Sequence, residues 1–159
     1  MRDDEFERLY AAEAPGLFSF LAYRTGDRAL AEDLLADAFE RALRARRGFD
    51  RRRGSQKTWL YAIALNVLRD AARRADAESR AYARSAPLSA GPDRLEAIEV
   101  RDELARAMAR LSDDEREAIA LRFGAELTVP EIAKVLGESL TTVEGRVYRA
   151  LRKLRGRLA

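Results

Sequence analysis

The sequence predicts an all-α fold, made of two small helical domains joined by a flexible linker. Apolar residues recur at helical spacing in successive stretches of the chain, and capping residues or glycines separate those stretches. From Ala75 to Asp93 the periodicity gives way to Ala, Ser, Arg, Pro and Gly, a composition typical of a linker. We therefore expect a first domain over 1–75, a linker over 76–94 and a second domain over 95–159.

The helices of the first domain are predicted from apolar stripes and from the residues at their ends. Pro15-Gly16 interrupts the first stripe, because proline cannot donate within a helix. Asp27 and Ser55 each precede a stripe, and their side-chain oxygens can accept from the free N–H groups of a helix start. The predicted helices cover residues 4–13, 17–23, 28–46 and 57–70.

The helix predicted over 28–46 carries acidic residues away from its apolar stripe. They are Glu32, Asp33, Asp37 and Glu40. Such a face can dock a basic helix of a partner, or it can be an ordinary solvated surface. The residues alone favour neither interpretation.

A basic loop over 46–54 precedes the helix that contains Trp59 and Tyr61. Cations that follow phosphates, next to aromatic rings that stack on bases, are typical of single-strand nucleic-acid binding. Trp59 can instead anchor the core, since its helix is apolar nearly all round. Asn66 is an amide among apolar neighbours, either hydrogen-bonded internally or directed at a base edge.

The second domain is predicted to end in a helix-turn-helix over 128–154. Thr128 and Glu131 have capping-box spacing, Gly137 suits a left-handed helix end, and Ser139 can cap a second helix directly afterwards. That second helix has a polar and basic outer face sized for a DNA major groove. The alternative is a plain helical hairpin with a solvated basic face. Further helices are predicted over 95–108 and over 112–124, the latter from a capping box at Ser112.

Composition excludes several classes of site. The chain has no Cys and no His, which rules out disulfides and thiolate metal sites and removes the commonest general base. We find no nucleophile–base pair and no phosphate loop, so we expect no catalytic residue, metal or cofactor. No 18-residue apolar run or signal peptide is present, and we expect a soluble cytoplasmic protein without membrane contact of its own.

These pieces, in this order, resemble a bacterial RNA polymerase sigma factor of the extracytoplasmic-function class over nearly the whole chain. Asp33–Phe39 resembles the family's Asp-Leu-Val-Gln-Glu-x-Phe stretch, and Phe49–Gly54 resembles its loop that captures a flipped base of the minus-ten element. Trp59–Asn66 resembles its Trp-Leu-x-x-Ile-Ala-Arg-Asn helix. Leu111–Arg155 resembles region four, which reads the minus-thirty-five element and touches the β-flap tip.

The resemblance implies one set of contact residues for each partner. Those for the β′ clamp of core RNA polymerase are Asp33, Leu34, Asp37, Phe39 and Glu40. Those for the minus-ten element of promoter DNA are Phe49, Asp50, Arg51, Arg52, Arg53, Lys57, Trp59, Tyr61 and Asn66. Those for the minus-thirty-five element are Ser139, Thr141, Thr142, Glu144, Arg146, Arg149 and Lys153. Members of the class often also bind an anti-sigma factor.

Some positions depart from the family pattern. Leu65 stands where Arg is usual, and Leu43 stands where Trp is common. Glu144 and Gly145 replace the frequent Lys and Ser of the recognition helix. A carboxylate there can accept from a cytosine amine, so Glu144 indicates an altered promoter preference.

Two other functions compete with the sigma-factor interpretation. One is a regulator whose first domain senses a ligand or dimerises, but the basic loop beside Trp59 argues against it. The other is a small enzyme. We also expect the two domains to be autonomous, either mobile in the free protein or clamped together by a partner.

Overall fold

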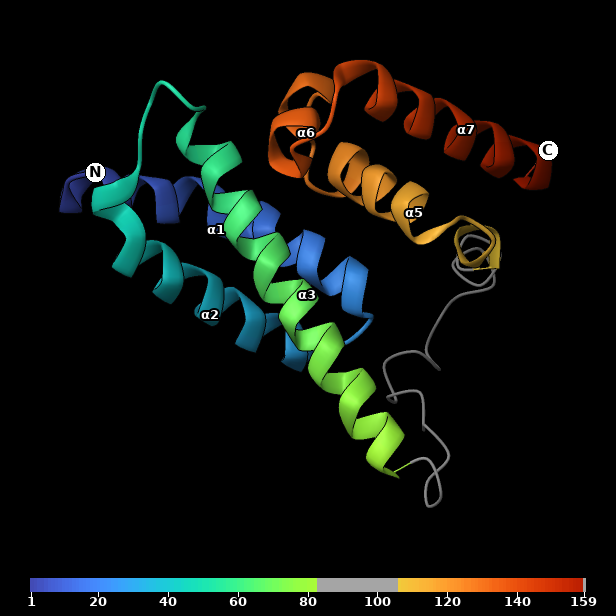
Figure 1. Ribbon diagram of the computed structural model, residues 1–159, viewed down its shortest axis with the longest axis horizontal. Coiled ribbons are helices and arrows are strands. Elements are labelled where there is room, and N and C mark those ends of the chain that lie inside the picture. Colours follow the sequence, from blue (N-terminus) through green and yellow to red (C-terminus); the bar gives the residue numbers. More distant parts are fainter. Residues whose placement is uncertain (83–105, 159) are drawn as a thin grey trace.

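The computed structural model describes residues 1–82, the first module, and residues 106–158, the second module (Figure 1). Throughout these two ranges the chain forms helices and turns and no β-strand, so the all-α prediction is confirmed. In the same ranges no helix combines the length and the apolar character that crossing a membrane requires.

The first module is a bundle of three long helices that pack against one another (Figure 1). Gly26, at φ 66°, ends the first helix, and Asp27 caps the second by accepting from the Leu30 N–H. Ser55 caps the third by accepting from the Thr58 N–H at 3.1 Å. The elements are α1 (Asp3–Thr25), α2 (Arg28–Ala45), the short 3-10 helix η1 (Arg46–Gly48) and α3 (Gln56–Tyr82).

One predicted helix break is wrong, because α1 runs through Pro15 without interruption. A proline inside a helix costs about 3 kcal/mol. Leu17, Phe20 and Leu21 follow it on the same helix and are fully buried. Burial of each such side chain contributes about 1.5–3 kcal/mol, so packing of the continuous helix outweighs the local penalty.

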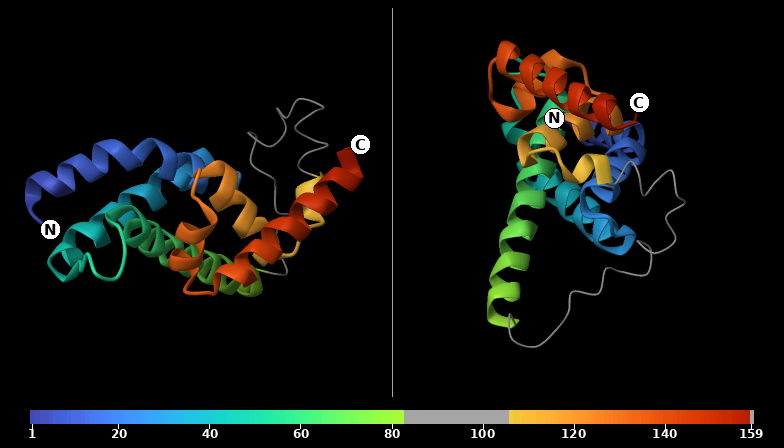
Figure 2. Two further views of the ribbon diagram at one scale, coloured as in Figure 1. Left: turned by 90° about the horizontal axis from the view of Figure 1, so that it is seen from above. Right: turned by 90° about the vertical axis from the view of Figure 1, so that its right-hand side faces the viewer.

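Helix α3 continues past residue 75, where the sequence analysis ended the first domain, and reaches Tyr82. Its side chains from Ala72 to Glu78 are exposed. Figure 2 (right) shows this end projecting beyond the bundle. The rest of the predicted linker and residues 95–105 of the next predicted helix lie outside the described residues.

The second module contains the predicted helix-turn-helix. Thr128 forms the capping box with Glu131, and Gly137 adopts the left-handed conformation at φ 67°. The predicted helix over 112–124 is also present, with Ser112 as its cap and its last residues wound as a π-helix. The elements are α5 (Asp113–Ile119), the π-helix η3 (Ala120–Gly124), α6 (Val129–Leu136) and α7 (Leu140–Leu158).

The two modules lie against each other in this structure (Figures 1 and 2). Helix α1 contacts η3, and α3 contacts α6. Buried residues of both modules form one continuous hydrophobic cluster. This arrangement differs from the expected mobile, autonomous domains, because each module covers apolar surface of the other.

Candidate nucleic-acid interface

The exposed face of α7 presents the side chains best placed to meet DNA. The inner face of α7 is buried through Val143, Val147 and Ala150. At 3.6 residues per turn, the opposite face carries Thr141, Gly145, Tyr148, Arg149 and Arg152. Of these, Thr141, Tyr148, Arg149 and Arg152 are exposed, and the predicted contact Glu144 is exposed beside them.

Tyr148 and Arg152 are not among the predicted minus-thirty-five contacts, although both lie in the middle of this face. Tyr148 is 63% exposed, a large apolar surface for a side chain in water. Helical spacing in the sequence already places both residues on the outer face of this helix, although the minus-thirty-five set does not include them.

Two predicted contacts, Arg146 and Lys153, lie on the flank of α7 rather than on its exposed face. Arg146 binds the Glu138 carboxylate at 2.6 Å, and its side chain is only 17% exposed. Lys153 binds the buried Glu115 of α5 at 2.6 Å. In this arrangement both cations form ion pairs within the second module, which sequence spacing did not reveal.

The start of α7 uses its hydroxyl groups for capping. Ser139 Oγ accepts from the Thr142 N–H at 3.2 Å and lies 2.7 Å from the Thr142 Oγ1. Both residues remain exposed. They therefore fix the direction of the helix start, where free N–H groups favour phosphate.

Gly145 leaves room for the side chain of Arg149. A Cβ added at Gly145 would lie 3.1 Å from the Arg149 Nη1. The guanidinium of Arg149 thus lies back over the glycine, at the centre of the exposed face.

In the first module, the basic loop and α3 form an aromatic cleft. The rings of Phe49 and Trp59 meet edge to face, with centroids 5.4 Å apart. The cleft they line, together with Asp50 and Arg53, measures about 180 Å³. Cavities of roughly 150 Å³ can hold a benzene ring, so the cleft is large enough for one planar base edge.

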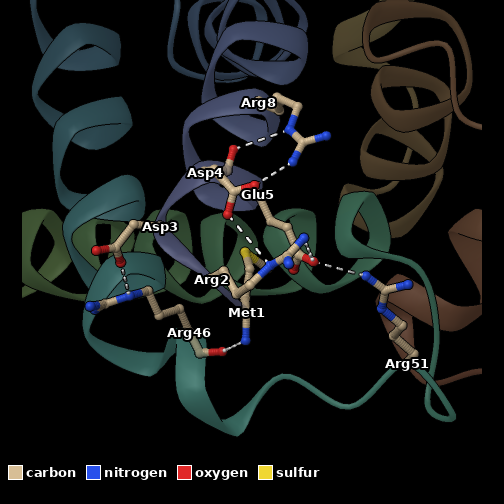
Figure 3. Close-up of polar contacts among 8 residues, drawn as sticks. All are labelled: Met1, Arg2, Asp3, Asp4, Glu5, Arg8, Arg46 and Arg51. Carbon is tan, nitrogen blue, oxygen red and sulfur yellow. Dashed lines mark hydrogen bonds and ion pairs between the residues drawn. The ribbon is translucent and has the colours of Figure 1, made fainter.

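Contacts with the start of α1 hold the base of this loop (Figure 3). Arg46 Nε binds Asp3 at 3.0 Å, and the Arg46 carbonyl accepts from the Met1 ammonium at 3.0 Å. Arg51 binds Glu5 at 3.3 Å. Arg51 was predicted to contact DNA, and here it is paired. Arg52 and Arg53 remain exposed at the tip, with Asp50 accepting from the Arg52 N–H at 2.9 Å.

The remaining predicted minus-ten residues divide between surface and core. Tyr61 is 1% exposed and packs edge to face on Phe20, so its ring cannot stack on a base in this structure. Asn66 is exposed, which leaves its amide free to reach a base edge. Lys57 and Trp59 are half-buried. Trp59 thus anchors the loop through Phe49 while keeping part of its ring accessible.

The predicted clamp contacts on α2 are likewise divided between core and surface. Leu34 and Phe39 are buried and hold the helix in the core. Asp33 and Glu40 are exposed. Asp37 pairs with Arg41 at 3.4 Å, and Arg41 also binds Asp70 of α3 at 2.9 Å. Hydrogen bonds from Arg41 and Arg73 hold the pKa of Asp70 below its ordinary value. Through these ion pairs, Arg41 holds the acidic face of α2 against α3.

Known proteins match both modules. Residues 9–78 match Sigma-70 region 2, and residues 101–154 match Sigma-70, region 4. The chain is 35% identical over 156 residues to the RNA polymerase sigma factor CarQ of Myxococcus xanthus, covering 96% of this chain and 88% of that protein. It is 30% identical over 153 residues to the ECF RNA polymerase sigma factor RpoE of Cereibacter sphaeroides, covering 94% and 84%.

Solved structures of sigma factors have the same fold. The sigma factor RpoE of Bartonella quintana, in complex with the anti-sigma factor NepR, matches 97% of this chain and 96% of its own, with a TM-score of 0.77 and 24% identity. CnrH, in complex with the cytosolic domain of CnrY, matches 98% and 88%, with a TM-score of 0.70 and 28% identity. The chain therefore belongs to the extracytoplasmic-function group of the sigma-70 family of RNA polymerase sigma factors.

Proposed function

We propose that this sigma factor reads the minus-thirty-five element as duplex through α7 and opens the minus-ten element with its basic loop and α3. The observation that supports this proposal is that the two modules present exposed surfaces of different chemistry. The α7 face carries Arg149 and Arg152 on a rigid helix, as duplex reading requires. The Phe49–Trp59 cleft offers aromatic rings beside exposed arginines, as single-strand capture requires.

The acidic face of α2 is the proposed contact for the β′ clamp of core RNA polymerase. Asp33 and Asp37 line a groove of about 720 Å³ between α2 and α3, floored by Leu34 and Leu68. A basic partner helix would meet Asp33 and Asp37 on the α2 side and apolar surface between the helices, with Arg74 and Glu78 on the α3 side. The β flap would meet the second module, and binding to polymerase would place the protein in the cytoplasm.

An anti-sigma factor is a further proposed partner. CnrH resembles this chain over both modules and was solved in complex with the cytosolic domain of CnrY. The likeness supports a similar partner for this chain. A sensor-type regulator is the alternative function, but it gives no use for a cleft of aromatic and basic residues on the first module.

Transcription by core polymerase in vitro tests the proposed function. Core enzyme with this chain should initiate at discrete sites on genomic fragments, and core enzyme alone should not. Permanganate reactivity of thymines near minus ten should appear only with the complete complex. Transcripts without such strand opening would contradict the role given to the first module.

A further inference from the structure

We propose that Arg146 is a positioning residue, and that Glu138 withholds its guanidinium from DNA. This inference rests on the proposed function, since it assumes that α7 reads a promoter. Arg146 Nη2 lies 2.6 Å from Glu138 Oε2, within the turn that joins α6 to α7. The same nitrogen lies 3.9 Å from Asp114 at the start of α5. One side chain thus connects the recognition helix to the turn and to α5.

The burial of this pair distinguishes it from a surface salt bridge. The side chains of Arg146 and Glu138 are 17% and 34% exposed. Glu138 also raises the pKa of Arg146, chiefly through the hydrogen bond between them. A charge-assisted hydrogen bond in such a setting is short and directional, so it fixes the rotation of α7.

Removing Glu138 should free a cation that can reach a phosphate. Each additional phosphate contact steepens the dependence of log K on log salt by about 0.9 for duplex DNA. The full chain carrying Glu138→Gln should therefore bind a scrambled duplex several-fold more tightly at low salt, with a slope steeper by roughly one. Glu144→Gln removes an equal charge from α7 itself and is the matched control.

The double variants show whether any gain in duplex affinity comes from the freed Arg146. In the Arg146→Met background, Glu138→Gln should add no more than Glu144→Gln adds, because only the gain that exceeds simple charge removal depends on Arg146. Arg146→Lys, which retains the ion pair, should keep the slope of the parent, and circular dichroism checks the fold of every variant. A gain from Glu138→Gln that is equally large without Arg146, or an unchanged slope, would overturn the proposal. Failure of the parent to support transcription would instead refute the proposed function. The salt dependence of duplex binding could still be measured in that case.

Discussion

Lys153→Met should destabilise the second module through one contact between α5 and α7. Glu115 accepts from the Ser112 N–H in the capping box and from Lys153 at 2.6 Å. Its side chain is 6% exposed, while that of Lys153 is 52% exposed. The substitution leaves the cap in place and removes only the cation.

The magnitude follows from the titration of Glu115. The hydrogen bond from Lys153, then that from the Ser112 backbone, lowers the pKa of Glu115 from 4.5 to about 2. One pKa unit corresponds to about 1.36 kcal/mol, so the contacts of this carboxylate, net of the opposing cost of its burial, contribute about 3 kcal/mol. Because Lys153 is half exposed and screened by water, we expect Lys153→Met to cost about 1–2 kcal/mol at pH 7.

The pH dependence has a definite sign. Because the folded pKa is depressed, the stabilisation is complete above the unfolded value of 4.5 and is lost as pH falls through about 2. Urea unfolding followed by circular dichroism should show the parent and Lys153→Met differing at pH 6, with roughly half of that difference gone at pH 3. Arg152→Met, an exposed neighbour, is the matched control. Equal stability of the two variants at pH 6, or a difference independent of pH, would refute this account of Glu115.

Further substitutions test the interfaces. Asp33→Arg with Asp37→Arg should weaken core-polymerase binding at least tenfold in a pull-down, whereas Glu7→Arg, at an exposed position of α1, should not; equal binding by the double variant would remove α2 as the contact. Arg149→Ala should cost about 1–3 kcal/mol of discrimination in transcription, only on templates that carry the minus-thirty-five element; an equal loss on templates without it would contradict base reading. Gly145→Ala should stabilise α7 by up to about 1 kcal/mol, yet reduce that same discrimination by displacing Arg149; unchanged discrimination would show that the position of Arg149 does not depend on the glycine.

Local signals in the sequence predicted the helix ends well. The capping residues Asp27, Ser55, Ser112 and Thr128 all accept from the predicted helix starts. These contacts join residues three apart, and spacing alone therefore determines them. The helix-turn-helix could be predicted for the same reason, since Gly137 marks its turn.

Contacts between distant residues could not be predicted in this way. Lys153 and Glu115 lie 38 residues apart, so nothing in local spacing pairs them. Arg146 and Lys153 therefore resembled DNA contacts in the sequence. The continuity of α1 through Pro15 likewise depends on tertiary burial of Leu17, which outweighs local propensity.

The closed arrangement of the modules depends on the same kind of contact. Leu17 and Leu121 read in the sequence as core residues of separate modules, and both are fully buried in one cluster here. Periodicity identifies such residues as buried but does not say which module covers them.

The most direct test of the central claim is promoter opening by core polymerase supplemented with this chain. On a template with both promoter elements, the parent should yield a transcript and permanganate-reactive thymines near minus ten. Arg52→Ala with Arg53→Ala should abolish the thymine reactivity while leaving core binding intact, because these two exposed arginines are the proposed strand-capturing charges. If the parent binds core polymerase but produces neither transcript nor open thymines on any genomic fragment, promoter opening by this chain is contradicted.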